Sequence, residues 1–185
     1  QDARFKVAQT SFYKGDFDWA LTQLKVLRSS TSQLIANDAM QLSLLISDNS
    51  LEDSTQTALK KYARADLLAY QNKNTEAIEV LEDILQNHKG EKFEDEALLK
   101  QAELLVEQKN YESAEFNYQK IVEFYGDGIL ADDAHFALGE LYENILNEPE
   151  KAKSHYEKII YNYQDSYYFP QARKNFRRLR GDAIN

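Results

Sequence analysis

The side chains that could carry chemistry in this sequence are 31 aspartates and glutamates and three histidines, with no cysteine. His88, His135 and His155 fall in three different expected helices, and no His-x-x-x-His or His/Cys spacing gathers them into a metal site. No carboxylate lies in an apolar run that would raise its pKa for acid–base catalysis. The six glycines form no phosphate-binding loop. The sequence therefore predicts a protein that is not an enzyme and has no catalytic residue, metal or cofactor.

One basic cluster stands out near the end of the chain, formed by Arg173, Lys174, Arg177, Arg178 and Arg180. A nucleic-acid or phospholipid role is conceivable for it, but we expect these side chains to favour the helix C-terminus and neighbouring acidic repeats. The formal net charge of −9 repels nucleic acid and anionic lipid at long range. We therefore predict no nucleic-acid partner and favour basic or neutral ligands.

An aromatic run precedes the basic cluster, at Tyr161, Tyr163, Tyr167, Tyr168 and Phe169. One interpretation is an exposed aromatic surface that binds a partner. Its position between the last expected hairpin and the last expected helix favours core packing instead.

The elements that hold these side chains are expected to be helices throughout. Apolar residues recur every three or four positions, and no segment alternates with period two. A hydrophobic content of 43% supports an ordered core, and a charged content of 29% suits helices that each keep a solvated face. No apolar run approaches the ~20 residues of a membrane span. We expect about ten helices, no sheet and no membrane span.

Residues 95–125 show the repeating unit most clearly, as two amphipathic helices with Ala102 in the first and Ala114 in the second. Small residues at these positions let two helices cross closely. The pair recurs as Ala8 with Ala20, Ala65 with Ala77 and Gly139 with Ala152. Successive members lie 37 or 38 residues apart, except for a first step of 57 residues. The sequence therefore predicts an array of helical hairpins with one extra helix inserted after the first.

The predicted hairpins span about residues 2–29, 53–88, 93–125 and 130–163, with the inserted helix at about 33–47 and a C-terminal capping helix at about 169–180. We expect one long helix at about 51–71, whose early part packs on the inserted helix. Together these elements form a single repeat domain spanning 1–185. The chain begins at Gln1 rather than Met, so we expect a mature form or part of a longer protein.

The last hairpin carries Leu138-Gly139, Tyr142, Ala152 and Tyr156 at the spacing of the L-G, Y, A and F/Y positions of the tetratricopeptide repeat, which it resembles. The signature Trp and the closing Pro of that family are missing from every unit. The long units are similar to variants common in bacterial cell-envelope scaffold proteins, including outer-membrane assembly lipoproteins. This resemblance implies a right-handed α-solenoid, and it favours the bacterial periplasm or cell envelope over the cytoplasm.

The resemblance also implies that the first helices of the hairpins line a concave groove that binds peptides or partner proteins. Its positions here are Phe5, Gln9, Phe12, Tyr62, Asp66, Tyr70, Leu99, Glu103, Glu107, Phe136, Glu140 and Glu143. Chaperone-binding members use Lys and Asn to clamp a C-terminal carboxylate, and that clamp is absent here. Because aromatic residues and carboxylates dominate, we expect a basic or basic-aromatic peptide. The competing interpretation is that these carboxylates only keep a solvent-facing surface soluble.

The expected function is a non-enzymatic scaffold for protein–protein interaction. Two alternatives remain open from the sequence. The chain could be a structural segment of a longer repeat array, or the regulatory domain of an enzyme whose catalytic part lies outside this sequence.

Overall fold

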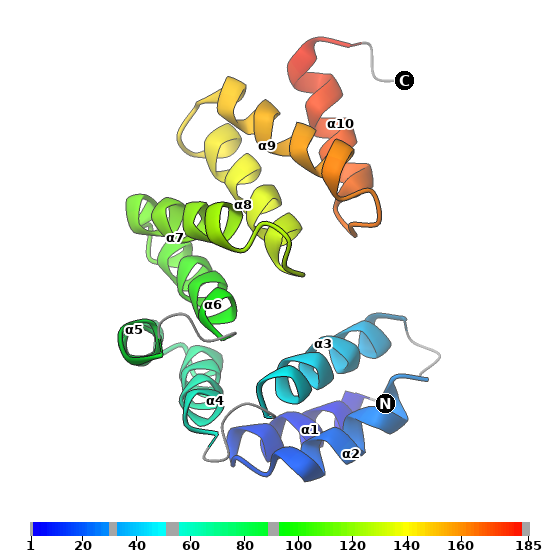
Figure 1. Cartoon of the computed structure of the whole chain (residues 1–185), viewed down its shortest axis with the longest axis vertical. Coiled ribbons are helices and arrows are strands. Elements are labelled where there is room, and N and C mark those ends of the chain that lie inside the picture. Colours follow the sequence, from blue (N-terminus) through cyan, green and yellow to red (C-terminus); the bar gives the residue numbers. More distant parts are fainter. Residues whose placement is uncertain (1, 30–32, 51–55, 89–92, 183–185) are drawn as a thin grey trace. The chain divides into compact units, whose positions relative to one another are not determined.

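A computed structural model describes residues 2–29, 33–50, 56–88 and 93–182, and these residues form ten α-helices and no strand (Figure 1). The helices are α1 (Asp2–Tyr13), α2 (Phe17–Leu27), α3 (Gln33–Ser50), α4 (Thr57–Tyr70), α5 (Asn74–Asn87), α6 (Glu94–Glu107), α7 (Tyr111–Phe124), α8 (Ala131–Asn144), α9 (Pro149–Asn162) and α10 (Phe169–Arg180). Packing between consecutive helices makes the chain a helical-repeat solenoid, which confirms the predicted fold class. None of the described helices is long and apolar enough to cross a membrane.

The chain divides into two compact units, Gln1–Ala97 and Leu98–Asn185. In the first unit, α1 and α2 form one hairpin and α4 and α5 form another. The small residues of both hairpins, Ala8 with Ala20 and Ala65 with Ala77, are fully buried. The predicted close crossings of these helix pairs are therefore confirmed, whereas the single repeat domain spanning 1–185 stays a prediction.

The inserted helix is α3, which packs mainly on α2 and buries Ala39, Ser43 and Ile46. The prediction of one helix over about 51–71 is wrong, because α4 begins only at Thr57. Gln56 precedes it with a φ of +52°, in the left-handed region that a right-handed helix cannot include. The expected packing of the early part of that helix on α3 falls on residues 51–55, which lie outside the described residues.

In the second unit, α6 pairs with α7 and α8 with α9, and the small residues Ala102, Ala114, Gly139 and Ala152 are all buried. Asn117 donates a hydrogen bond across the first pair to Gln101 Oε1 at 2.7 Å, and both side chains are buried. At Gly139 the fit is tight, since a Cβ there would lie 2.5 Å from Cε1 of Tyr156. Only glycine allows α9 to approach α8 this closely with the Tyr156 ring in place.

The predicted capping helix is α10, which packs on α9 and buries Ala172 and Asn175. It ends at Gly181, whose φ of +86° is left-handed. There the N–H of Gly181 donates to the Arg178 carbonyl, and the N–H of Asp182 donates to that of Arg177. This arrangement satisfies the last carbonyls of the helix, as glycine-terminated helices commonly do.

Glu96, in the first turn of α6, has a raised pKa although it lies in no apolar run of the sequence. Its Oε2 atom is buried and has no hydrogen-bond partner among the described residues. Burial raises the pKa of Glu96 most, and a hydrogen bond and charge from Asp95 raise it further. A hydrogen bond from Asn49 of α3 opposes these effects. The burial comes from packing in the folded unit, so an apolar run in the sequence could not reveal it.

Replacing Glu96 with glutamine is expected to stabilise the first unit at pH 7 by about 1–3 kcal/mol, since one pKa unit corresponds to about 1.4 kcal/mol. The folded state keeps a proton that the unfolded state releases above its ordinary pKa near 4.5. Native Glu96 therefore lowers stability as pH rises from 4.5 towards the folded pKa, and the gain from glutamine should shrink near pH 4.5. Urea unfolding at pH 4.5 and pH 7 measures both effects.

The matched control for this variant is Glu79→Gln, because Glu79 is exposed on α5. It should change the unfolding free energy by less than about 0.5 kcal/mol at either pH. Equal effects of Glu96→Gln and Glu79→Gln would show that burial of Glu96 costs the fold nothing.

Candidate interaction surfaces

In the first unit, the residues expected to line a groove lie on α1 and α4. The Tyr13 hydroxyl at the end of α1 donates to Asp66 Oδ2 at 3.2 Å, and the rings of Tyr13 and Tyr70 lie 6.4 Å apart. Burial and the charge of Asp66 raise the pKa of Tyr13, so its phenol stays neutral. Phe5 and Gln9 are half-buried about two turns and one turn before Tyr13, respectively, while 70% of Tyr70 is exposed. The structure thus brings Asp66 and Tyr70 together beside the end of α1.

Two other aromatic residues assigned to that groove pack inside the first unit. Phe12 is only 1% exposed and its ring lies 5.8 Å from that of Phe17, so its expected place in a groove is wrong. The reason is that Phe12 faces the second helix of its own hairpin. Tyr62 is half-buried and its ring meets Phe93 edge-on at 5.0 Å.

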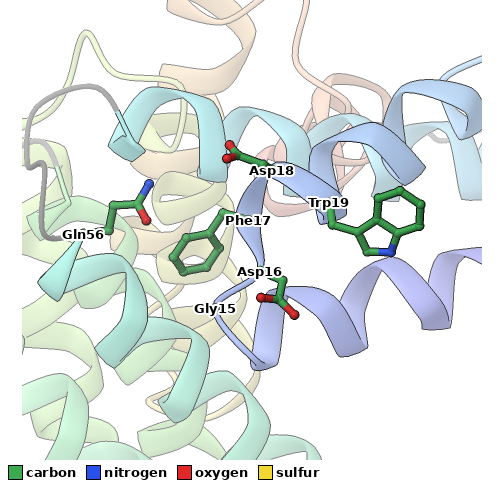
Figure 2. A pocket seen from close by; sticks show the side chains of 6 residues that line it. All are labelled: Gly15, Asp16, Phe17, Asp18, Trp19 and Gln56. Carbon is green, nitrogen blue, oxygen red and sulfur yellow. The ribbon is translucent and has the colours of Figure 1, made fainter.

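The turn between α1 and α2 borders an open pocket of about 300 Å³ (Figure 2). It is lined by Gly15, Asp16, Phe17, Asp18, Trp19 and Gln56. Figure 2 shows that the labelled side chains do not gather around one point, since Trp19 lies well apart from Gln56 and Phe17. Without converging polar groups, the pocket has no arrangement that would orient a small ligand.

In the second unit, the residues expected to line a groove lie on α6 and α8. Leu99 is half-buried on α6, and Glu103 and Glu107 are exposed on the same helix. Phe136 of α8 stacks on Tyr168, with ring centroids 4.4 Å apart and an angle of 15° between the planes. Burial raises the pKa of Tyr168 most, the charge of Asp133 and a hydrogen bond to it raise it further, and the charge of Glu103 adds a smaller effect in the same direction.

Further side chains extend this part of the surface, which we call the aromatic–acidic face and define as Glu103, Asp133, Phe136, Tyr167 and Tyr168. The Tyr168 hydroxyl donates to Asp133 Oδ1 at 2.9 Å, and the Tyr167 ring meets the Tyr168 ring edge-on at 5.5 Å. Burial raises the pKa of Asp133 above its ordinary value. The sequence pattern had not indicated Asp133, which lies three residues before Phe136 on the same helix.

The expected core packing of the aromatic run is wrong for two of its members. Tyr167 is 85% exposed and Tyr161 is 67% exposed, whereas Tyr163 and Tyr168 are half-buried. The Tyr163 hydroxyl donates to the Gly126 carbonyl at 2.7 Å. The aromatic run therefore has some rings half-buried and others exposed on the surface.

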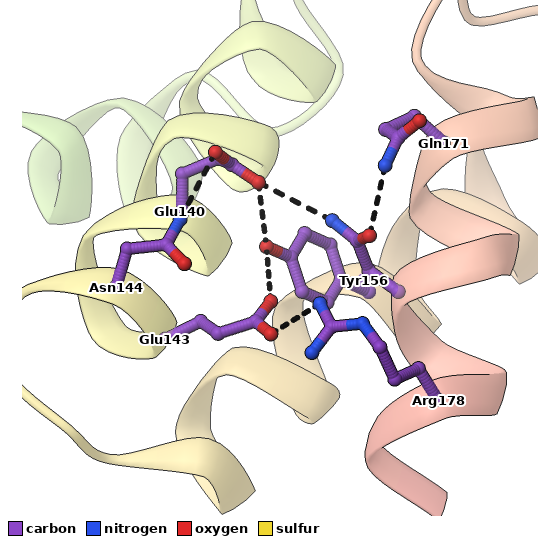
Figure 3. Close-up of polar contacts among 7 residues, drawn as sticks. Glu140, Glu143, Asn144, Tyr156, Gln171 and Arg178 are labelled. Carbon is purple, nitrogen blue, oxygen red and sulfur yellow. Dashed lines mark hydrogen bonds and ion pairs between the residues drawn. The ribbon is translucent and has the colours of Figure 1, made fainter.

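Glu140 and Glu143, also expected in the groove, belong to a polar network that joins α8 to α10 (Figure 3). The Tyr156 hydroxyl lies 3.1 Å from Glu140 Oε1 and 3.1 Å from Glu143 Oε2. Asn175 of α10 donates to Glu140 Oε1 at 3.2 Å, and Arg178 of α10 forms an ion pair with Glu143. For Arg178, the expected pairing of the basic cluster with acidic repeats is confirmed. Both carboxylates already serve the attachment of the capping helix.

His135 of α8 and His155 of α9 meet across their hairpin, with their Nδ1 atoms 2.9 Å apart. The His155 ring also stacks on Tyr142 at 5.5 Å. Burial lowers the pKa of both histidines to about 4, so both are neutral at pH 7. The sequence spacing did not predict this contact, because the two histidines are 20 positions apart and lie on different helices. No group of three or more possible metal ligands is present among the described residues.

Two hairpins of the second unit, α6–α7 and α8–α9, match a known protein family. Residues 96–128 and 133–166 each match the family described as the tetratricopeptide repeat. The second match covers the hairpin with Leu138-Gly139, Tyr142, Ala152 and Tyr156, so the resemblance noted in the sequence is confirmed. No curated protein matches the sequence.

The family match agrees with the helical architecture of the two segments. The first match spans α6 and α7 and the second spans α8 and α9. Repeats of this family generally mediate protein–protein interaction, and the family is typically non-catalytic. The hairpins α6–α7 and α8–α9 of this chain are tetratricopeptide repeats.

Proposed function

We propose that this chain is a non-enzymatic scaffold that binds a basic or basic-aromatic peptide segment of a partner protein. The observation that carries the proposal is the aromatic–acidic face, where the rings of Phe136 and Tyr168 stack and the Tyr168 hydroxyl donates to Asp133. The face of an aromatic ring attracts a guanidinium or ammonium group, at about 0.5–1 kcal/mol for an exposed contact. The exposed ring of Tyr167 adds a further contact surface.

Charge supports the same class of ligand. The exposed carboxylates of Glu103 and Glu107 lie on α6, within a chain of net charge −9. A negative field of this kind speeds the approach of a cationic peptide and weakens in salt. Glu140 and Glu143 add to the field from inside the polar network, where their oxygens hold Tyr156, Asn175 and Arg178.

The proposed ligand surface in the second unit therefore consists of Leu99, Glu103, Glu107 and Phe136 together with Tyr167 and Tyr168. In the first unit, the corresponding proposal covers Phe5, Gln9, Tyr62, Asp66 and Tyr70, with Tyr70 the most exposed of its rings. Each surface is proposed for its own unit.

Fluorescence anisotropy with a labelled Arg/Trp-rich peptide, at about 50 mM and about 300 mM salt, tests this proposal. Glu103→Lys should weaken binding about tenfold at the lower salt concentration, because it replaces an attraction by a repulsion. The matched control is Glu112→Lys, which makes the same charge change at an exposed position of α7 and should cost less than about twofold. Equal losses for the two variants would remove the aromatic–acidic face as the binding site.

A further inference from the structure

The capping helix α10 repeats α8 at a distance of 38 residues. Ala172 of α10 stands where Ala134 stands in α8, and both are fully buried. Asn175 and Arg178 of α10 reach back to α8, while Ala172 is buried in the packing of α10 on α9. By position and packing, α10 is the first helix of a further hairpin.

In α8, one face receives the second helix of its hairpin, α9. His135 contacts His155, a Cβ at Gly139 would meet Tyr156, and Tyr142 stacks on His155. These positions of α8 are therefore the docking face for a partner helix.

The same positions of α10 carry arginine. Arg173, Arg177 and Arg180 replace His135, Gly139 and Tyr142, and Phe176 replaces Leu138. Arg173 and Arg180 are exposed, while Arg177 and Phe176 are half-buried. We call these four residues the α10 outer face, and no helix among the described residues covers it.

A carboxylate already lies on this face. Arg180 Nε donates to Asp182 Oδ1 at 2.9 Å, and Arg177 Nε lies 3.6 Å from Asp182 Oδ2. The Arg180 guanidinium also lies over the Phe176 ring, 5.4 Å from its centroid. Two of the arginines, Arg177 and Arg180, are thus arranged around a single acidic group, and Arg180 also lies over an apolar ring.

We propose that the α10 outer face binds an acidic amphipathic helix of a partner protein, on the side of α10 that corresponds to the side of α8 on which α9 packs. The register of α10 identifies this side, and Phe176 offers an apolar contact for that helix. Because Arg177 replaces Gly139, the bound helix lies farther from α10 than α9 lies from α8. The three arginines select carboxylates, which guanidinium groups bind through paired hydrogen bonds. Asp182 occupies part of the site until the partner helix arrives. This surface and its ligand are separate from the aromatic–acidic face and its basic peptide.

A synthetic helical peptide with leucine at three- and four-residue spacing and glutamate between provides the probe, with a lysine-for-glutamate version as its counterpart. Binding of the glutamate peptide, measured by fluorescence anisotropy, should weaken at least about tenfold in Arg173→Glu/Arg177→Glu. The matched control Arg4→Glu/Lys25→Glu reverses two exposed charges in the first unit and should cost less than about twofold. Equal losses in the two variants, or tighter binding of the lysine peptide to the α10 outer face, would overturn the proposal.

A second variant is expected to bind the glutamate peptide more tightly than the native chain. It changes no residue within α10. Asp182→Asn removes the internal competitor and should tighten binding of the glutamate peptide about threefold. Asp165→Asn makes the same charge change at an exposed position outside the face, and it should have a smaller effect. If the two variants bind equally, general charge explains the gain and the proposal fails.

Light scattering of the chain alone tests a different occupant, a second copy of this chain. The proposal expects a monomer whose mass is the same for the native chain and for Arg173→Glu/Arg177→Glu. A dimer of the native chain that dissociates in this variant would place a second copy on the α10 outer face and overturn the proposal.

Discussion

The free energy of unfolding of the second unit is expected to fall by about 3 kcal/mol when Gly139 is replaced by leucine. Even a single Cβ at this position would lie 2.5 Å from Cε1, 2.8 Å from Cζ and 2.9 Å from Cδ1 of Tyr156. The Tyr156 ring has no room to withdraw, because it is fully buried and its hydroxyl is held by Glu140 and Glu143. Leucine favours a helix over glycine by less than about 1 kcal/mol, so overpacking outweighs propensity.

Urea unfolding followed by circular dichroism measures this loss. Ala137→Leu is the matched control, because Ala137 lies two residues earlier on α8 and is only half-buried. That control should change stability by less than about 1 kcal/mol. Tyr156→Ala combined with Gly139→Leu should recover part of the loss, since the added side chain then fills the vacated space. If Gly139→Leu were no worse than Ala137→Leu, the small residues would not form the packing seam between the helices.

The same small residues explain why so much of the fold could be predicted from the sequence. A helix pair can cross closely only where both partners are small, so Ala102 with Ala114 and Gly139 with Ala152 mark the hairpins directly. The spacing of apolar residues along each helix then indicates which of its faces is buried. The start of α4 escaped prediction, because the pattern continued through Gln56 while its backbone turned left-handed.

The candidate surfaces were only partly predictable, for a different reason. Position within a repeat assigned Phe136, Glu140 and Glu143 to one helix, and all three lie on α8. It does not reveal what lies over them. The capping helix contacts Glu140 and Glu143 through Asn175 and Arg178, and the aromatic segment before it contacts Phe136 through Tyr168.

The contact between the two histidines could not be predicted from the sequence either, because it joins the two helices of one hairpin. His135 and His155 have no recognisable spacing in sequence, because their meeting depends on how far α9 is shifted along α8. Gly139 allows the two helices to approach closely by admitting the Tyr156 ring. The histidine pair is thus a consequence of the close crossing rather than of a local motif.

Acidification is expected to lower the stability of the second unit by about 2–4 kcal/mol between pH 7 and pH 4.5, through this histidine pair. Unfolded histidines take up protons near pH 6.5, whereas burial lowers the pKa of folded His135 and His155 to about 4. Between these values the unfolded state binds more protons, so stability falls as pH falls. The charge of Lys158 lowers both pKa values further, and that of Lys151 lowers the pKa of His155, whereas Glu115 of α7 acts on His155 in the opposite direction.

The hydrogen bond between the rings reinforces this dependence. With both rings neutral, one Nδ1 can donate to the other across 2.9 Å, but two charged rings would place two donors against each other. Urea unfolding from pH 7.5 to 4.5 should therefore show a flatter pH dependence for His135→Leu/His155→Phe than for the native chain. His88→Gln, which removes the third histidine from the first unit, is the matched control and should leave the slope of the second unit unchanged. A native slope retained in the double variant would mean that carboxylates alone produce the acid sensitivity, and that the buried histidine contact does not govern it.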